Sequence, residues 1–162
     1  MLAAAPLSAA ETAVTASNGV TISVNGDDFA GRYEYVAPSI DISDGNLTGA
    51  FFVAAIKKGA TPTINAYQGF VMYSGEWRFY KSAVFRGGDP VRYTRTDGKV
   101  GSCRYGCTLT ENFSIQLSRA EIAKYAVDGI VQIQVRSQSS TQTFMISIPV
   151  AYITAVDEVK KR

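Results

Sequence analysis

Short runs of alternating apolar and polar residues constrain the fold of this chain more than any other feature. In residues 131–136 and 144–148, every second side chain is Val, Ile or Phe, and the side chains between them are Gln, Arg, Ser or Met. This period of two predicts a hairpin with one buried face and one face in water. Similar runs recur without any strand–helix–strand alternation. The sequence therefore predicts a mainly β domain, either β-sandwich-like or an open barrel of short antiparallel strands.

The richest aromatic segment, residues 67–85, reads YQGFVMYSGEWRFYKSAVF. Its polar break at residues 74–76 contains a glycine, so the two arms beside the break are predicted to pair as a β-hairpin. Most of the apolar bulk comes from four side chains: Phe70, Met72, Trp77 and Phe79. Aromatic cross-strand pairs stabilise a sheet by about 0.2–1 kcal/mol each. We therefore expect this hairpin at the centre of the core.

Other strands are predicted at residues 20–24, 32–36, 48–56, 91–95 and 112–117. Turn residues separate them. Residues 25–28 are expected to close one hairpin, and Asp97–Gly98 a second, because an Asp-Gly pair suits a tight turn that needs positive φ at both positions. Pro38 confines the residues just after it to an edge strand at most.

Two helices are predicted after residue 117. Ser118 and Glu121 fit a capping box, in which each side chain bonds the other residue's main-chain amide, so a short helix is expected over about 119–126. Pro149 suits the start of a C-terminal helix over about 150–160. Apolar residues recur every three positions in that helix. The basic residues 160–162 match the negative end of its dipole.

The chain of 162 residues has the length of one domain, which we expect over residues 17–162. The first ten residues are small and apolar and end in a pattern that suits signal cleavage, but they lack a basic region. Residues 1–16 are therefore expected to be disordered or the remnant of a secretory signal. No run approaches the ~20 apolar residues of a transmembrane helix, so no transmembrane segment is expected.

The only two cysteines, Cys103 and Cys107, enclose three residues that fit a hairpin loop with a left-handed glycine. Such a loop brings its flanking residues within disulfide distance. We expect a Cys103–Cys107 disulfide and a periplasmic or secreted location. Reduced cysteines, a redox pair and a metal site are the alternatives. The spacing is not that of thioredoxin, and two thiolates without histidine leave a zinc shell unfilled.

Histidine is absent from the sequence, which excludes Ser-His-Asp and Cys-His sites within this chain. No glycine-rich phosphate-binding motif is present either. We expect no cofactor, no metal ion and no catalytic residues. A hydrolase that uses carboxylates alone is the enzymatic alternative, and its candidate residues are Glu34, Glu76, Glu111 and Glu121.

Charge is distributed unevenly along the chain. Residues 78–104 hold seven basic and two acidic side chains, a net +5, whereas residues 11–50 hold six acidic and one basic, a net −5. Tyrosines interleave with the basic residues, and such mixtures bind anions and stack on rings. The candidate binding residues are Arg78, Tyr80, Arg92, Tyr93, Arg95, Arg104 and Tyr105. Solvated strand faces and a head-to-tail contact between copies are the alternatives.

These features together predict a non-enzymatic, exported β domain that binds or assembles with another envelope component. The partner is expected to be a protein or an envelope polymer. Nucleic acid is not expected, because the net charge of the whole chain is only +2. A homo-oligomer is possible. Two other functions stay open: a small inhibitor that presents the Cys103–Cys107 loop to a protein, and a polyanion- or glycan-binding module that uses residues 78–105.

Overall fold

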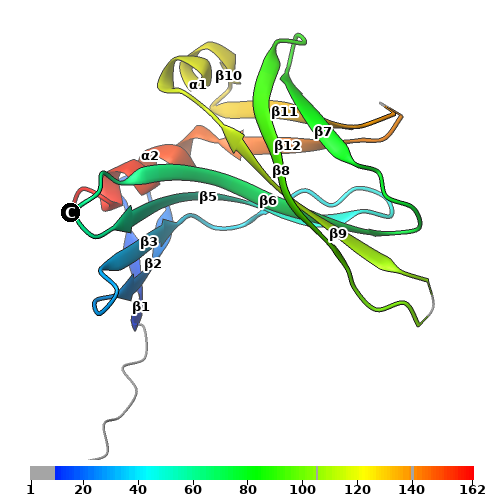
Figure 1. Ribbon diagram of the computed structural model, residues 1–162. Helices are drawn as coiled ribbons and strands as arrows, with labels where there is room; N and C mark the ends of the chain where they lie inside the picture. Colours follow the sequence, from blue (N-terminus) through cyan, green and yellow to red (C-terminus); the bar gives the residue numbers. More distant parts are fainter. Residues whose placement is uncertain (1–9, 105, 140) are drawn as a thin grey trace, which may run out of the picture.

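The computed structural model describes residues 10–104, 106–139 and 141–162 and shows a mainly β protein (Figure 1). Twelve strands form one antiparallel open sheet, and two short helices accompany it. The strands are β1 (Ala10–Thr15), β2 (Thr21–Asp27), β3 (Arg32–Val36), β4 (Ile40–Asp41), β5 (Thr48–Lys58), β6 (Ile64–Ser74), β7 (Tyr80–Phe85), β8 (Pro90–Val100), β9 (Thr108–Gln116), β10 (Ala126–Val127), β11 (Ile130–Ser137) and β12 (Thr143–Pro149). The helices are α1 (Arg119–Tyr125) and α2 (Val150–Val159).

The sheet curls into two sections that face each other. Its strand order is β1-β2-β3-β5-β6-β9-β8-β7-β11, with β10 and β12 also paired to β11 and β4 paired to β5. Strand β8 pairs with β9 along most of its length and with β7 only at its start. The sheet therefore folds back on itself at β8, which links the two sections. The section with β7, β11 and β12 lies above the section with β5, β6 and β9 in Figure 1. Strand β12 lies near β4 but does not pair with it, so the sheet stays open there.

The core fills the space between the two sections. Phe113 on β9 lies 5.6 Å from Phe144 on β12, measured between ring centroids, and Phe144 lies 4.9 Å from Tyr80 on β7. The predicted alternation in residues 131–148 is confirmed. Val131, Ile133 and their apolar neighbours on β11 and β12 are buried, and the glutamines between them point outward. Each fully buried aliphatic or aromatic side chain stabilises the fold by about 1.5–3 kcal/mol.

Both predicted helices are present. In α1 the Ser118 hydroxyl accepts from the Glu121 amide at 3.2 Å, and the Glu121 carboxylate accepts from the Ser118 amide at 2.7 Å, which confirms the capping box. Helix α2 begins after Pro149 and buries Ile153 and Val156 against β5 and β2. Neither helix in the described residues is long and apolar enough to cross a membrane.

The predicted hairpin in residues 67–85 is wrong. Strand β6 pairs with β5 and β9, and β7 pairs with β8 and β11, so the two arms belong to different sections of the sheet. The chain leaves β6 at a corner in which Phe79 has a positive φ of 50°. The predicted core residues follow the same error: Phe70, Met72 and Trp77 are half-buried and Phe79 is exposed. The buried side chains of this segment are Tyr67, Val71, Tyr73, Tyr80, Ala83 and Phe85.

Two predicted turns also differ from the structure. Strand β8 runs through Asp97–Gly98 and carries a bulge between Arg95 and Asp97, so the reversal comes later, over residues 101–107. Strand β2 extends to Asp27, and the turn to β3 follows it. At the N-terminus, β1 pairs with β2 ahead of the expected domain start at residue 17. Residues 1–9 lie outside the described part of the chain.

Candidate functional site

Four connections meet at one end of the curled sheet, on the right in Figure 1: residues 44–47, 74–79, 101–107 and 137–142. We call this the loop end. Arg78 joins three of these connections. Its Nη2 donates to the Asn46 side-chain oxygen at 2.8 Å, and its carbonyl oxygen accepts from the Gln138 amide at 3.3 Å. The loop end is therefore built from segments that are far apart in the sequence.

Glu111, on β9, lies fully buried beneath the loop end. Its carboxylate accepts hydrogen bonds from the main-chain amides of Phe79 at 3.0 Å and Tyr80 at 3.1 Å, and from Arg95 Nε at 2.8 Å. The Tyr73 hydroxyl donates to it as well, and itself accepts from the Arg78 amide at 3.0 Å. These donors compensate the cost of burying a charge. The bonds from the two main-chain amides to Glu111 also take the place of the strand-to-strand hydrogen bonds that a β6–β7 hairpin would have made.

Gly98 on β8 makes room for this cluster. Gly98 is the direct pairing partner of Glu111. A side chain at Gly98 would collide with the guanidinium of Arg95, and its Cβ would lie 3.2 Å from the Trp77 ring. The glycine thus lets Arg95 reach from β8 to the buried carboxylate.

Trp77 and Phe79 form a stacked aromatic pair at the loop end, with ring centroids 5.9 Å apart and an interplanar angle of 24°. The Arg95 guanidinium carbon lies 5.2 Å from the Trp77 centroid and 5.4 Å from the Phe79 centroid, within cation–π distance. Phe79 is 43% exposed. The bond to Glu111 fixes Arg95, and Arg95 in turn supports the exposed ring.

A pocket of about 380 Å³ opens beside this aromatic pair. Its lining residues are Glu76, Trp77, Arg78, Phe79, Gln138, Ser139 and Gln142. Aromatic rings, side-chain amides, a hydroxyl and one charge of each sign therefore surround one space. That mixture suits a ligand with both apolar faces and many hydrogen-bonding groups.

The tyrosine hydroxyls near Glu111 stay protonated. Burial, together with the hydrogen bond to Glu111, raises the pKa of Tyr73 far above its usual value. Burial and the nearby Glu111 charge raise the pKa of Tyr93 as well. Tyr73 is thus a permanent donor to the carboxylate, which suits a structural cluster.

The structure brings only some of the predicted binding residues together. Arg78, Arg95, Tyr80 and Tyr93 surround the Glu111 cluster, but Tyr80 is fully buried and belongs to the core. Arg92 lies apart from them, with its Nη2 3.7 Å from the Glu121 carboxylate at α1. Two further predicted residues lie in the loop 101–107: Arg104, which is exposed, and Tyr105, which is outside the described residues.

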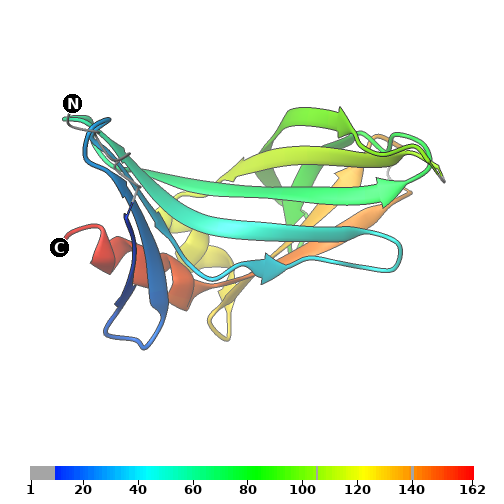
Figure 2. The same ribbon diagram turned by 90° about the horizontal axis from the view of Figure 1, so that it is seen from below.

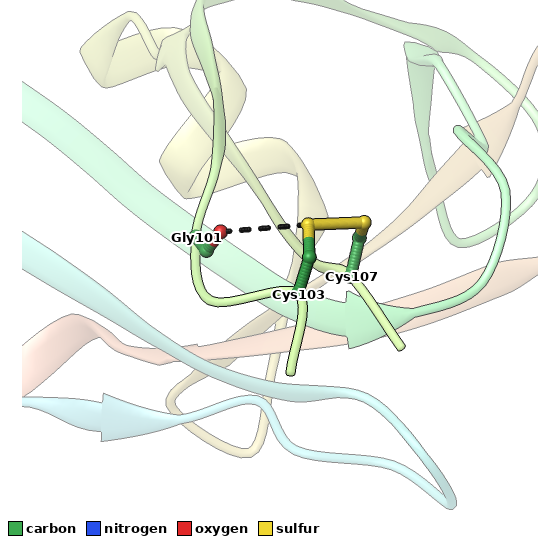
Figure 3. The surroundings of a disulfide bond; sticks show 3 residues. All are labelled: Gly101, Cys103 and Cys107. Carbon is green, nitrogen blue, oxygen red and sulfur yellow. Dashed lines mark hydrogen bonds between the residues drawn. A yellow bond between two sulfur atoms is a disulfide. The ribbon is translucent and has the colours of Figure 1, made fainter. Parts of the chain in front are cut away.

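The disulfide between Cys103 and Cys107 is present in that loop (Figure 3). Gly106 has a φ of 103°, which confirms the expected left-handed glycine. The Cys103 sulfur lies 3.8 Å from the Gly101 carbonyl oxygen. The Gly101 amide donates to the carbonyl oxygen of Thr108, the first residue of β9, at 2.7 Å. The disulfide therefore fixes the shape of a loop at the same end as the pocket.

Sequence reasoning missed most of the pocket. It assigned Trp77 and Phe79 to the core and proposed no site between the paired runs at residues 131–136 and 144–148. It proposed Glu111 only as one of four candidate carboxylates. In the described residues, no three potential ligands come together in a way that would hold a metal ion. Comparisons with protein-family models, with curated proteins and with solved structures give no match to this chain.

Proposed function

We propose that this protein is an exported, non-enzymatic module that binds a saccharide chain of the cell envelope in the loop-end pocket. One observation carries the proposal: an aromatic pair, the half-buried Trp77 and the exposed Phe79, is held in place beside side-chain amides and a carboxylate. Sugar rings present C–H faces that pack on aromatic rings and hydroxyl groups that pair with amides and carboxylates. The pocket offers both kinds of contact.

Pre-organisation supports the proposal. Arg95 is fixed by Glu111, and the corner that carries Trp77 and Phe79 is fixed by two main-chain bonds to the same carboxylate. Binding to a site that is already ordered costs less conformational entropy. Weak contacts to a neutral sugar then suffice for measurable affinity.

The chemistry of the carboxylates favours binding over catalysis. Both oxygens of the buried Glu111 are occupied by structural donors. Among the described residues, Glu76 is the one acidic side chain that lines the pocket, so a carboxylate pair for hydrolysis is not assembled there. The disulfide supports export, because such bonds persist in oxidising compartments.

The experiment that tests this proposal uses the fluorescence of Trp77, which is the only tryptophan. The protein is titrated with neutral oligosaccharides of glucose, N-acetylglucosamine, mannose and galactose, and calorimetry confirms each change. We expect at least one class to bind and to shift the emission. Phe79→Ala should weaken that binding at least tenfold.

Phe29→Ala is the matched control, because Phe29 is 99% exposed in the turn between β2 and β3. It should bind as the unmodified protein does. If none of the oligosaccharides binds, or if Phe79→Ala binds as tightly as the control, the proposal is wrong.

A further inference from the structure

Two adjoining hollows lie on the outer face of the section that contains β7 and β11. The larger, of about 330 Å³, is lined by Val84, Arg136 and Met145, among others. The smaller, of about 170 Å³, is lined by Tyr125 and Ile130, among others. Two residues, Arg86 and Gln132, line both hollows, so the hollows lie side by side. We call the two hollows together the β11 trough.

Strand β11 connects the trough to the loop-end pocket. Its outward side chains Gln132, Gln134 and Arg136 line the larger hollow, and Gln138, just after the strand, lines the loop-end pocket. Residues 130–138 span roughly 25–30 Å at the usual rise of a strand. A chain-like ligand that occupies the pocket can therefore continue along β11.

In the described residues, the trough is lined by two basic side chains, Arg86 and Arg136, and by one acidic side chain, Asp128 in the smaller hollow. Arg86 and Arg136 form no ion pair with an acidic side chain in the described residues, whereas other cations do. Arg136 Nε donates to the Gln134 side-chain oxygen at 2.9 Å, which holds the guanidinium over the strand. No carboxylate lines the larger hollow. Unpaired guanidinium groups on a rigid strand suit carboxylate or phosphate groups, which they bind with two parallel hydrogen bonds.

The spacing of the two arginines indicates a polymer. Phe85 pairs with Ile133, so Arg86 lies about four residues along the sheet from Arg136. That corresponds to roughly 13 Å. A single monosaccharide cannot span both guanidinium groups, but successive units of a chain can. The exposed Lys81 is the extra residue of the bulge next to Arg136, and it adds positive charge where the trough meets the loop end.

We infer that the ligand is an acidic saccharide chain that runs from the loop-end pocket along β11, with its carboxylate or phosphate groups bound by Arg136 and Arg86. This inference rests on the proposed function of the pocket. It adds the charge of the ligand, its polymeric nature and the path that it follows.

The test compares chains that differ only in charge or length. The probes are oligogalacturonates of two, four and eight units, their neutral methyl esters, and a phosphorylated mannan oligosaccharide with its dephosphorylated form. We expect the eight-unit acid to bind at least tenfold more tightly than both the two-unit acid and the eight-unit ester. This difference should shrink as salt is added. Comparison of the carboxylated and phosphorylated probes identifies which anion is preferred.

The variant Arg86→Gln/Arg136→Gln should remove that tenfold gain and leave the binding of neutral chains unchanged. Arg32→Gln/Lys58→Gln is the matched control, because it removes the same charge at two exposed positions outside the trough and away from the loop end. Circular dichroism and thermal unfolding verify that each variant is folded. A control that loses affinity as strongly as the trough variant would overturn the inference.

The outcomes separate the two proposals. If acidic and neutral chains bind equally and Phe79→Ala weakens both, the trough inference is wrong and the proposed function stands. If the trough variant abolishes binding of the acids while Phe79→Ala has no effect, the trough stands and the function assigned to the pocket is wrong. If no chain binds, both are wrong.

Discussion

The two ends of the molecule each contain a buried carboxylate, but the two carboxylates have different partners. At the loop end, Glu111 accepts from two main-chain amides, a tyrosine and Arg95. Near the helices, Asp157 on α2 contacts only side-chain cations: Arg119 of α1, and Lys160 at 2.6 Å. Glu111 therefore bonds to the main chain and fixes its course at the corner, whereas Asp157 bonds only to side chains of α1 and of the end of α2.

The groups that surround the two carboxylates differ in the same way. Lys160 also donates to Asn65 at the start of β6, so the Asp157 cluster ties α1 and α2 to the sheet. These are cations on flexible side chains, and Arg119 is largely exposed. If Asp157 is removed, Arg119 can turn to water, and Lys160, whose side chain is only 15% exposed, keeps its bond to Asn65. If Glu111 is removed, the amides of Phe79 and Tyr80 stay buried without an acceptor, which costs more.

The largest effect is expected from Glu111→Gln. A glutamine has one oxygen and an amino group, so at least one buried donor loses its acceptor and Arg95 loses its counter-ion. We expect the free energy of unfolding in urea to fall by about 3–5 kcal/mol. The emission of Trp77 should shift as well, because Arg95 no longer supports its ring. Glu11→Gln, at an exposed position, is the control. A loss under about 1 kcal/mol would contradict a structural role for Glu111.

The next largest effect is expected from loss of the disulfide. Cys103→Ser/Cys107→Ser should lower the free energy of unfolding by about 2 kcal/mol, because the bridge closes only a very small loop. Trp77 emission should stay unchanged, since the corner at residues 74–79 does not depend on the bridge. Mass spectrometry of the unreduced protein should find no free thiol, and two free thiols would refute the bridge.

A smaller loss of about 1–2 kcal/mol is expected for Asp157→Asn, because Arg119 regains water and Lys160 keeps its bond to Asn65. Chemical denaturation measures it, and Trp77 emission in the folded state reports on the loop end. The two ends should be independent, so the losses for Asp157→Asn and Glu111→Gln should add in the double variant. Strong non-additivity would show that the two carboxylates are coupled.

Asp157 should also make stability depend on acid pH. Burial alone would raise its pKa, but hydrogen bonds and charges from Lys160 and Arg119 outweigh burial and lower the pKa below its usual 3.8. The unfolded chain therefore binds the proton first as pH falls. The contribution of Asp157 is complete above about pH 5 and is lost as pH falls through 3.8 toward the lower pKa of the folded state. The difference in unfolding free energy between wild type and Asp157→Asn should shrink as pH falls from 5 to 3. A constant difference over this range would contradict a lowered pKa for Asp157.

Gly98→Ala is expected to have the smallest effect on stability. The new methyl group reduces the freedom of the unfolded chain but collides with Nη2 at the flexible end of Arg95. The bond to Glu111 comes from Nε and can persist while Nη2 shifts, so the net change should stay within about 1 kcal/mol. The local effect should still be clear. Arg95 must move, and Trp77 emission should shift toward that of Glu111→Gln. Gly101→Ala is the control, because the nearest atom to its added Cβ is 3.4 Å away. Unchanged Trp77 emission in Gly98→Ala would show that Arg95 does not support the aromatic pair.

Local patterns predicted the parts of the fold that local physics decides. The period of two in residues 131–148 fixes which side chains are buried, because one face of β11 and β12 meets the core. The capping box at Ser118 and the loop between Cys103 and Cys107 depend on residues a few positions apart. These predictions were therefore accurate.

The errors occur where distant residues decide the structure. The break at residues 74–76 resembles a hairpin turn, but the donors that follow it bond to Glu111, more than thirty positions later in the sequence. The Asp97–Gly98 pair resembles a tight turn, but Gly98 is needed opposite Glu111. The basic segment resembled one surface, but the alternation of β8 turns Tyr93 and Arg95 inward and Arg92 outward. No pattern within a window of ten residues contains this information.

The placement of the last helix has a practical consequence. Helix α2 is held to the β1–β2 turn by the Glu158 carboxylate, which accepts from the Ser17 hydroxyl at 2.6 Å. Its end lies beside the first residues of β6 (Figure 2). The pocket is lined by residues 76–79, which follow the last residue of β6. A biosensor chip attached through Arg162 would therefore hold the molecule by its far side and leave the aromatic pair directed into the flowing solution. Immobilised and free protein should then report the same affinity.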